Sequence, residues 1–113
     1  MKRALVKSAV WVCYDLGVQA DYEGMYTWLD EHRAKECGDS LAFLNYEYSG
    51  SLLQALTADL KKSVQITKRT RVYVIYREQD TKKMKGNFII GGRKAPPWSG
   101  FAAAVGSADT DES

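Results

Sequence analysis

The sequence predicts an α+β domain of ferredoxin-like architecture, an antiparallel sheet with two helices on one face and the other face uncovered. Two observations predict it. The chain has 113 residues, which suits one core and hardly two. Its apolar residues also follow the order strand, helix, strand, strand, helix, strand, with one additional strand. Residues 1–101 are expected to form this domain, and residues 102–113 a flexible acidic tail.

The first elements are a strand and a helix. Residues 5–14 are apolar except for Lys7 and Ser8, which predicts a central strand buried on both faces. Asp21 can cap a helix that ends near residues 32–33, because aspartate accepts hydrogen bonds from the first free backbone amides. The apolar residues of this helix fall at helical spacing: Tyr22, Met25, Tyr26 and Leu29.

A hairpin and a second helix are expected next. Residues 34–37 and 40–48 flank the turn pair Gly38-Asp39 and predict a short and a longer strand. The Ser-Gly-Ser run at 49–51 supplies an N-cap. The helix that follows carries Leu52, Leu53, Leu56, Leu60 and Val64 on its apolar side.

The last third of the chain predicts a second hairpin. Residues 71–77 are rich in β-branched and aromatic side chains, and residues 87–90 form a further strand after a polar link. Gly91-Gly92 ends that strand, or presents backbone donors to a phosphate. The uncovered sheet face is expected to serve a partner, because the chain has more aromatic rings than one small core requires. These rings are Trp11, Tyr14, Tyr46, Tyr48, Tyr73 and Tyr76.

The net charge of +2 conceals an uneven distribution. Residues 1–60 carry −4, residues 61–94 carry +9 and residues 95–113 carry −3. Basic residues interleaved with rings such as Phe88 and Trp98 suit nucleic acid, since cations contact phosphates and rings stack on bases. The alternative is a solvated rim neutralised by the acidic segments. The residues expected to contact nucleic acid are Lys68, Arg69, Arg71, Arg77, Lys82, Lys83, Lys85, Arg93 and Lys94.

Signatures of catalysis are few. The chain has no phosphate-binding glycine loop and no zinc ligand pair, and its single histidine, His32, is expected to be a solvated helix-end residue. Asp15 ends the first strand, where it is either held for catalysis or caps the turn into Gly17. One carboxylate holds magnesium weakly, so a catalytic Asp15 requires a twofold dimer that brings two copies together.

The cysteines and the hydropathy bear on location. Cys13 and Cys37 are too few for a disulfide scaffold, and we expect reduced thiols in or near the core. A cytoplasmic protein follows from that expectation. No apolar stretch approaches the roughly 20 residues that a membrane-spanning helix needs.

One segment carries a resemblance. Val12-Cys13-Tyr14-Asp15-Leu16, followed by Asp21-Tyr22-Glu23 at a helix start and Asp39-Ser40 at a strand start, resembles the small ferredoxin-like nuclease superfamily. That superfamily includes the small CRISPR adaptation subunit and virulence-associated protein D. The resemblance spans residues 5–77 and implies a homodimer in which two Asp15 side chains face each other, with Ser40 matching the family serine. The chain departs from the pattern at Lys68-Arg69-Thr70-Arg71, where many members carry an acidic residue.

Three functions follow as expectations. The first is a nucleic-acid-binding homodimer, with a magnesium-dependent endoribonuclease as its catalytic version, in which Asp15 of both chains orients metal and water. RNA and DNA are both open as ligands. The second is a non-enzymatic dimeric interaction or regulatory module. The third is a small-molecule-binding domain that uses the open sheet face and Gly91-Gly92.

Overall fold

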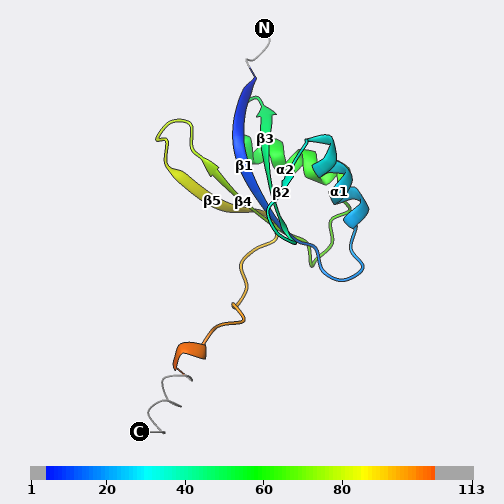
Figure 1. Ribbon diagram of the computed structural model, residues 1–113, viewed down its shortest axis with the longest axis vertical. Coiled ribbons are helices and arrows are strands. Elements are labelled where there is room, and N and C mark those ends of the chain that lie inside the picture. The colour runs from blue at the N-terminus through cyan, green and yellow to red at the C-terminus, as the bar shows by residue number, and fades with distance from the viewer. Residues whose placement is uncertain (1–4, 104–113) are drawn as a thin grey trace.

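The structure is a computed structural model that describes residues 5–103 of the chain. It has two layers, a five-stranded antiparallel sheet and two helices packed against one face of that sheet (Figure 1). The elements in chain order are β1 (Val6–Asp15), α1 (Tyr22–Glu31), β2 (Lys35–Glu36), β3 (Leu41–Tyr48), α2 (Leu52–Ser63), β4 (Arg71–Arg77) and β5 (Met84–Ile90).

The order of strands in the sheet is β2-β3-β1-β4-β5, and every neighbouring pair is antiparallel. Each helical connection skips one strand: α1 leads from β1 past β3 to β2, and α2 leads from β3 past β1 to β4. The predicted α+β class and antiparallel sheet are confirmed. This strand order is compatible with the predicted ferredoxin-like arrangement, with β5 as an added edge strand.

The central strand is buried on one face only. Val10, Val12 and Tyr14 lie beneath the helices, while Trp11 is half-buried and Cys13 exposed on the opposite face. The prediction that β1 is buried on both faces is therefore wrong, because alternate side chains of a strand point to opposite faces and the helices cover one. Both cysteines are free, as predicted, but both are exposed rather than near the core.

Both predicted helix caps are confirmed. Asp21 accepts from the backbone N–H of Gly24 with Oδ1 and from that of Gln65 with Oδ2, each at 2.9 Å, so it also ties α1 to the end of α2. The Ser51 hydroxyl accepts from Gln54 at the start of α2.

The last strand begins three residues earlier than predicted, at Met84, and ends at Ile90. Gly91 then turns the chain away from the sheet with a φ of +71° (Figure 1). Of the predicted tail, only Ala102 and Ala103 are described, in a helical turn with Phe101, and the rest lies outside the described residues. Within residues 5–103, no helix is long and apolar enough to cross a membrane.

Candidate nucleic-acid interface

One end of the sheet gathers basic side chains from two separate segments. β1 and β5 end there and β4 begins there. Lys68 and Arg69 precede β4, and Lys94 follows β5. Together with Arg71 and Asp15 they line a groove of about 470 Å³, which is also lined by Gly17, Val18, Gly91 and Gly92.

A tight turn presents the first two of these cations. Thr70 is buried, and its Oγ1 accepts from the backbone N–H of Thr67 at 2.9 Å. The Thr67 hydroxyl in turn accepts from the N–H of Arg69 at 3.2 Å. Because both threonines are engaged inside the turn, Lys68 and Arg69 stay exposed at its tip.

Asp15, the predicted catalytic residue and metal ligand, is paired with Arg71. The two residues face each other on β1 and β4, and Arg71 donates to Asp15 Oδ2 from Nη2 at 2.6 Å and from Nε at 3.2 Å. The structure thus places a cation beside Asp15. Within residues 5–103, no three His, Cys, Asp or Glu side chains are grouped so that they could hold a metal ion. The magnesium site stays a prediction.

Aromatic rings adjoin the groove on the open face of the sheet. Tyr73 and Phe88 pair across β4 and β5 with ring centroids 4.8 Å apart in an edge-to-face arrangement. The Arg93 guanidinium lies 5.7 Å from the Tyr73 ring centre and 5.4 Å from that of Phe88. Arg71 lies 5.9 Å from the Phe88 ring centre. Gly86 makes room for this cluster, because a Cβ there would meet the Tyr73 hydroxyl oxygen at 2.2 Å.

The other predicted nucleic-acid contacts lie at the opposite end of the hairpin. β4 is seven residues long, which separates its two ends by about 20 Å. Arg77 donates from Nε to the Lys82 carbonyl oxygen at 3.0 Å. Lys85 Nζ lies 2.7 Å from Glu78, and this hydrogen bond lowers the pKa of Glu78 and raises that of Lys85. The nine predicted residues thus form two clusters rather than one: Lys68, Arg69, Arg71, Arg93 and Lys94 at the groove, and Arg77, Lys82, Lys83 and Lys85 at the hairpin turn.

The six aromatic residues predicted as surplus rings divide between the two faces. Only Trp11 and Tyr73 lie on the open face, while Tyr14, Tyr46, Tyr48 and Tyr76 are buried beneath the helices. Phe43 was not among the six, although its alternation with Ala42 and Leu44 puts it on the open side. Its ring centre lies 4.9 Å from that of Trp11.

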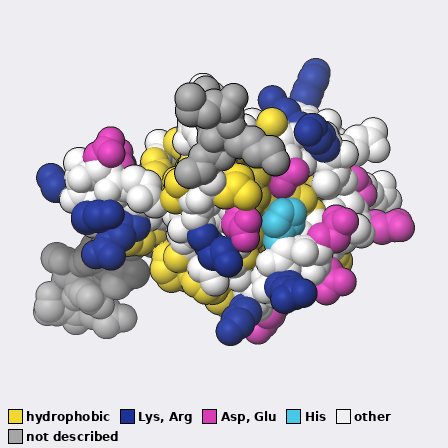
Figure 2. Space-filling view, turned by 90° about the horizontal axis from the view of Figure 1, so that it is seen from above, with side chains coloured by type: hydrophobic (Ala, Val, Ile, Leu, Met, Phe, Trp, Pro, Cys, Tyr) yellow, Lys and Arg dark blue, Asp and Glu magenta, His cyan; other side chains and the backbone are white. Residues whose placement is uncertain are grey.

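His32 ends α1, as predicted, but its ring is only partly exposed because it belongs to a packed network. Its ring centre lies 4.3 Å from that of Trp28, with the two ring planes tilted by 33°, and Nδ1 lies 2.8 Å from the Trp28 carbonyl oxygen. Nε2 lies 3.4 Å from Asp59 Oδ2, which also accepts from Trp28 Nε1 and the Tyr46 hydroxyl. Burial and the Asp59 carboxylate raise the pKa of Tyr46. Figure 2 shows the histidine, the single one in the chain, at the surface among acidic side chains.

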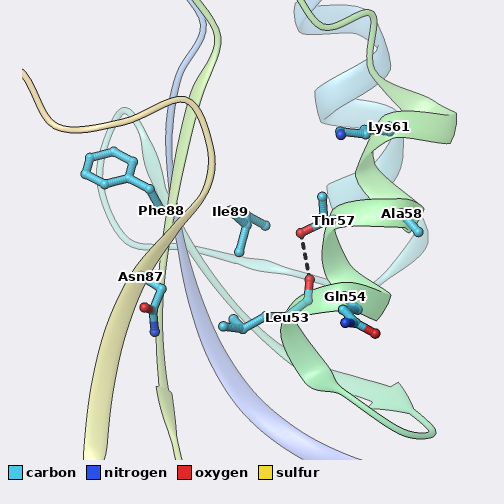
Figure 3. A pocket seen from close by; sticks show the side chains of 8 residues that line it. All are labelled: Leu53, Gln54, Thr57, Ala58, Lys61, Asn87, Phe88 and Ile89. Carbon is cyan, nitrogen blue, oxygen red and sulfur yellow. Dashed lines mark hydrogen bonds between the residues drawn. The ribbon is translucent and has the colours of Figure 1, made fainter.

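A second hollow lies on the helix side, between α2 and β5 (Figure 3). It measures about 480 Å³, and Leu53 and Ile89 point into it from the two elements. The Thr57 hydroxyl at its wall is already engaged, because it donates to the Leu53 carbonyl oxygen at 2.6 Å. The sequence did not predict this hollow. The strand pattern shows that β5 exists but not how far α2 lies from it.

Comparisons of the chain with protein-family models, curated proteins and solved structures gave no match. The resemblance to the small ferredoxin-like nucleases therefore stays a prediction. The functional argument rests on the groove and the rings beside it.

Proposed function

We propose that this protein is a ferredoxin-like domain that binds nucleic acid at the groove between Asp15, Lys68 and Lys94. The observation that carries the proposal is the convergence of five basic side chains beside aromatic rings; they come from the turn before β4, the first residue of β4 and the segment after β5. Cations at this density release counterions from a phosphate backbone, which is the main source of affinity for nucleic acids. One carboxylate, Asp15, lines the same groove and is already paired with Arg71.

The catalytic version is a narrower proposal. A magnesium-dependent endoribonuclease would need Asp15 of two chains to exchange Arg71 for a metal ion. Cleavage of labelled RNA with magnesium, lost in Asp15→Asn, would support it. Binding without cleavage in the same samples would leave the binding proposal intact and remove the catalytic one.

The binding test removes two charges at the groove and two elsewhere. Short labelled RNA and DNA, single- and double-stranded, are titrated at two salt concentrations against wild type, Lys68→Gln/Arg69→Gln and the control Lys61→Gln/Lys62→Gln on α2. We expect the groove variant to bind more weakly and to lower the slope of log K against log salt by about 1.4–1.8, since each lost phosphate contact contributes about 0.7–0.9. The control should keep the wild-type slope. The proposal would be overturned if wild type does not bind at low salt, or if the groove variant and the control lose the same affinity.

A dimeric interaction module is the second candidate, and a specific patch favours it. Trp11, Phe43 and Ile75 are neighbours across β3, β1 and β4 on the open face, where no helix covers them. Exposed apolar patches of this kind mark protein interfaces. Sedimentation of wild type and Phe43→Glu tests it: a dimer that the variant splits supports this candidate, and a monomeric wild type removes it together with the paired-Asp15 mechanism. The free cysteines support a cytoplasmic setting for either candidate.

A further inference from the structure

A smaller pocket adjoins the basic groove. It measures about 260 Å³ and is lined by Phe88 of β5, by Arg71 and Arg93, and by the Pro96–Trp98 stretch. Trp98 is 71% exposed, so its indole is not part of the core. The pocket is just below the range of roughly 300–1,000 Å³ that holds drug-sized ligands. It therefore suits one ring system rather than an extended molecule.

The pocket and the groove share part of their lining. Arg71 and Lys94 line both of them. A ligand with a flat ring in the pocket can consequently place an attached anionic group beside the cations of the groove. A nucleotide unit has these two parts, a planar base and a phosphate.

The walls of the pocket match the flat ring as well as the anion. Arg93 lies over the Phe88 ring, and planar guanidinium and aromatic groups are the surfaces on which unstacked bases pack. Trp98 adds an exposed ring, on the strand-free segment after β5, to the half-buried ring of Phe88. Bases inside a duplex are stacked on their neighbours, so a pocket of this kind is open to an unpaired base only.

We propose that the Phe88–Trp98 pocket holds an unpaired base, which makes single-stranded nucleic acid the ligand class of the groove. This inference rests on the proposed binding function. It adds that stacking, and not charge alone, distinguishes single strands from duplexes at this site.

The test compares two exposed aromatic residues on the same segment. Trp98→Ala removes the ring at the pocket, and Phe101→Ala removes a ring of similar exposure that does not line it. We expect Trp98→Ala to weaken binding of a single-stranded oligonucleotide roughly 5- to 150-fold, the loss of one base–aromatic stack. Duplex binding should be unchanged, Trp98→Phe should restore most of the affinity, and Phe101→Ala should behave as wild type.

A second readout does not depend on affinity differences. Bound single strands should quench tryptophan fluorescence in wild type, and the quenching should disappear in Trp98→Phe although that variant still binds. An oligonucleotide with abasic sites should bind wild type as weakly as intact oligonucleotide binds Trp98→Ala.

The outcomes separate this inference from the function it rests on. The base-pocket proposal is wrong if Trp98→Ala loses as much affinity for duplexes as for single strands. It is also wrong if Phe101→Ala weakens single-strand binding as much as Trp98→Ala does. The binding proposal survives that result as long as Lys68→Gln/Arg69→Gln still weakens both ligands. If wild type binds neither ligand at low salt, both proposals fall together.

Discussion

The role of Asp15 depends on the residue that faces it on the neighbouring strand. Asp15 ends the central strand, but the register places Arg71 directly opposite, and the guanidinium closes on its Oδ2. The pair makes Asp15 a positioning residue for Arg71, which lies over Phe88 and lines both the groove and the base pocket. The sequence could not predict this pair, since 56 residues separate the two side chains.

A neutral isostere at Asp15 tests which of its two effects dominates binding, the positioning of Arg71 or the repulsion of phosphate. Asp15→Asn keeps an oxygen for Arg71 but removes a negative charge from the groove, so we expect nucleic acid to bind about two- to fivefold tighter, as the loss of roughly one weak charge repulsion predicts. Fluorescence anisotropy at low salt measures it. At high salt, where ions screen the charge, Asp15→Asn and wild type should bind with equal affinity, which is the internal control. Weaker binding by Asp15→Asn would contradict this expectation and would show that holding Arg71 in place matters more for affinity than the repulsion.

Asp21 gives the molecule a pH-dependent tie between its helices. Its two oxygens each accept a backbone amide, and these hydrogen bonds, that from Gln65 first, lower its pKa below the ordinary 3.8. A lowered pKa stabilises the fold above the unfolded value and the stabilisation is lost as pH falls through the folded value. Asp21→Asn has only one acceptor oxygen, so its Tm should be lower by about 4–8 °C at neutral pH, the effect of one lost hydrogen bond in a domain this size.

The Tm gap between wild type and Asp21→Asn should close as pH falls below about 3.8. Thermal unfolding followed by circular dichroism from pH 7 to pH 2.5 measures it. Asp30 is an exposed carboxylate at the other end of α1, so Asp30→Asn is the control, and its Tm should differ little from that of wild type. A gap that stays constant across this pH range would show that the Asp21 charge does not stabilise the fold.

Among the elements, those with a strong local pattern were predicted closely and those set by packing were not. The caps at Asp21 and Ser51 and the strand over residues 71–77 depend on local chemistry, and all three are confirmed. Burial of β1 on both faces was wrong because it depends on how many layers cover the sheet. The early start of β5 at Met84 reflects pairing with Arg77, which overrides the low strand propensity of Lys85 and Gly86.

The turn at the end of β5 depends on one of two adjacent glycines. Gly91 has a φ of +71°, and a Cβ there would meet the Thr70 carbonyl oxygen at 2.6 Å. Gly92 has no such contact within 4 Å. We therefore expect Gly91→Ala to destabilise the protein by about 1–3 kcal/mol, and Gly92→Ala to change stability by less than about 0.5 kcal/mol.

Urea denaturation of both glycine variants provides the measurement. Since Gly91 packs against Thr70 and Arg71, Gly91→Ala should also weaken nucleic-acid binding, whereas Gly92→Ala should not. Equal stabilities of the two variants would mean that the turn relaxes without cost and that the groove does not depend on it.

At the scale of the whole molecule, the basic third of the sequence is folded into two separated clusters. The positive charge does lie in residues 61–94, as the sequence shows. Residues only a few positions apart can still lie at opposite ends of a sheet, because an extended strand separates them. Arg71 and Arg77 start and end the same strand, about 20 Å apart. The clusters therefore act together only on a ligand long enough to reach both.

This separation predicts a dependence on oligonucleotide length. Successive phosphates of one strand are about 3.4 Å apart where the bases stay stacked as in a duplex, and farther apart in an extended single strand, so roughly six nucleotides or fewer span the distance between the clusters. Lys82→Gln/Lys83→Gln should leave binding of a trinucleotide unchanged. With a strand of about twelve nucleotides the same variant should weaken binding and lower the salt slope by about 1.4, two single-strand contacts. If the variant binds the longer strand as tightly as wild type does, the ligand contacts only the groove and the hairpin cluster has another role. If the variant loses as much affinity for the trinucleotide as for the longer strand, the hairpin and not the groove is the primary contact.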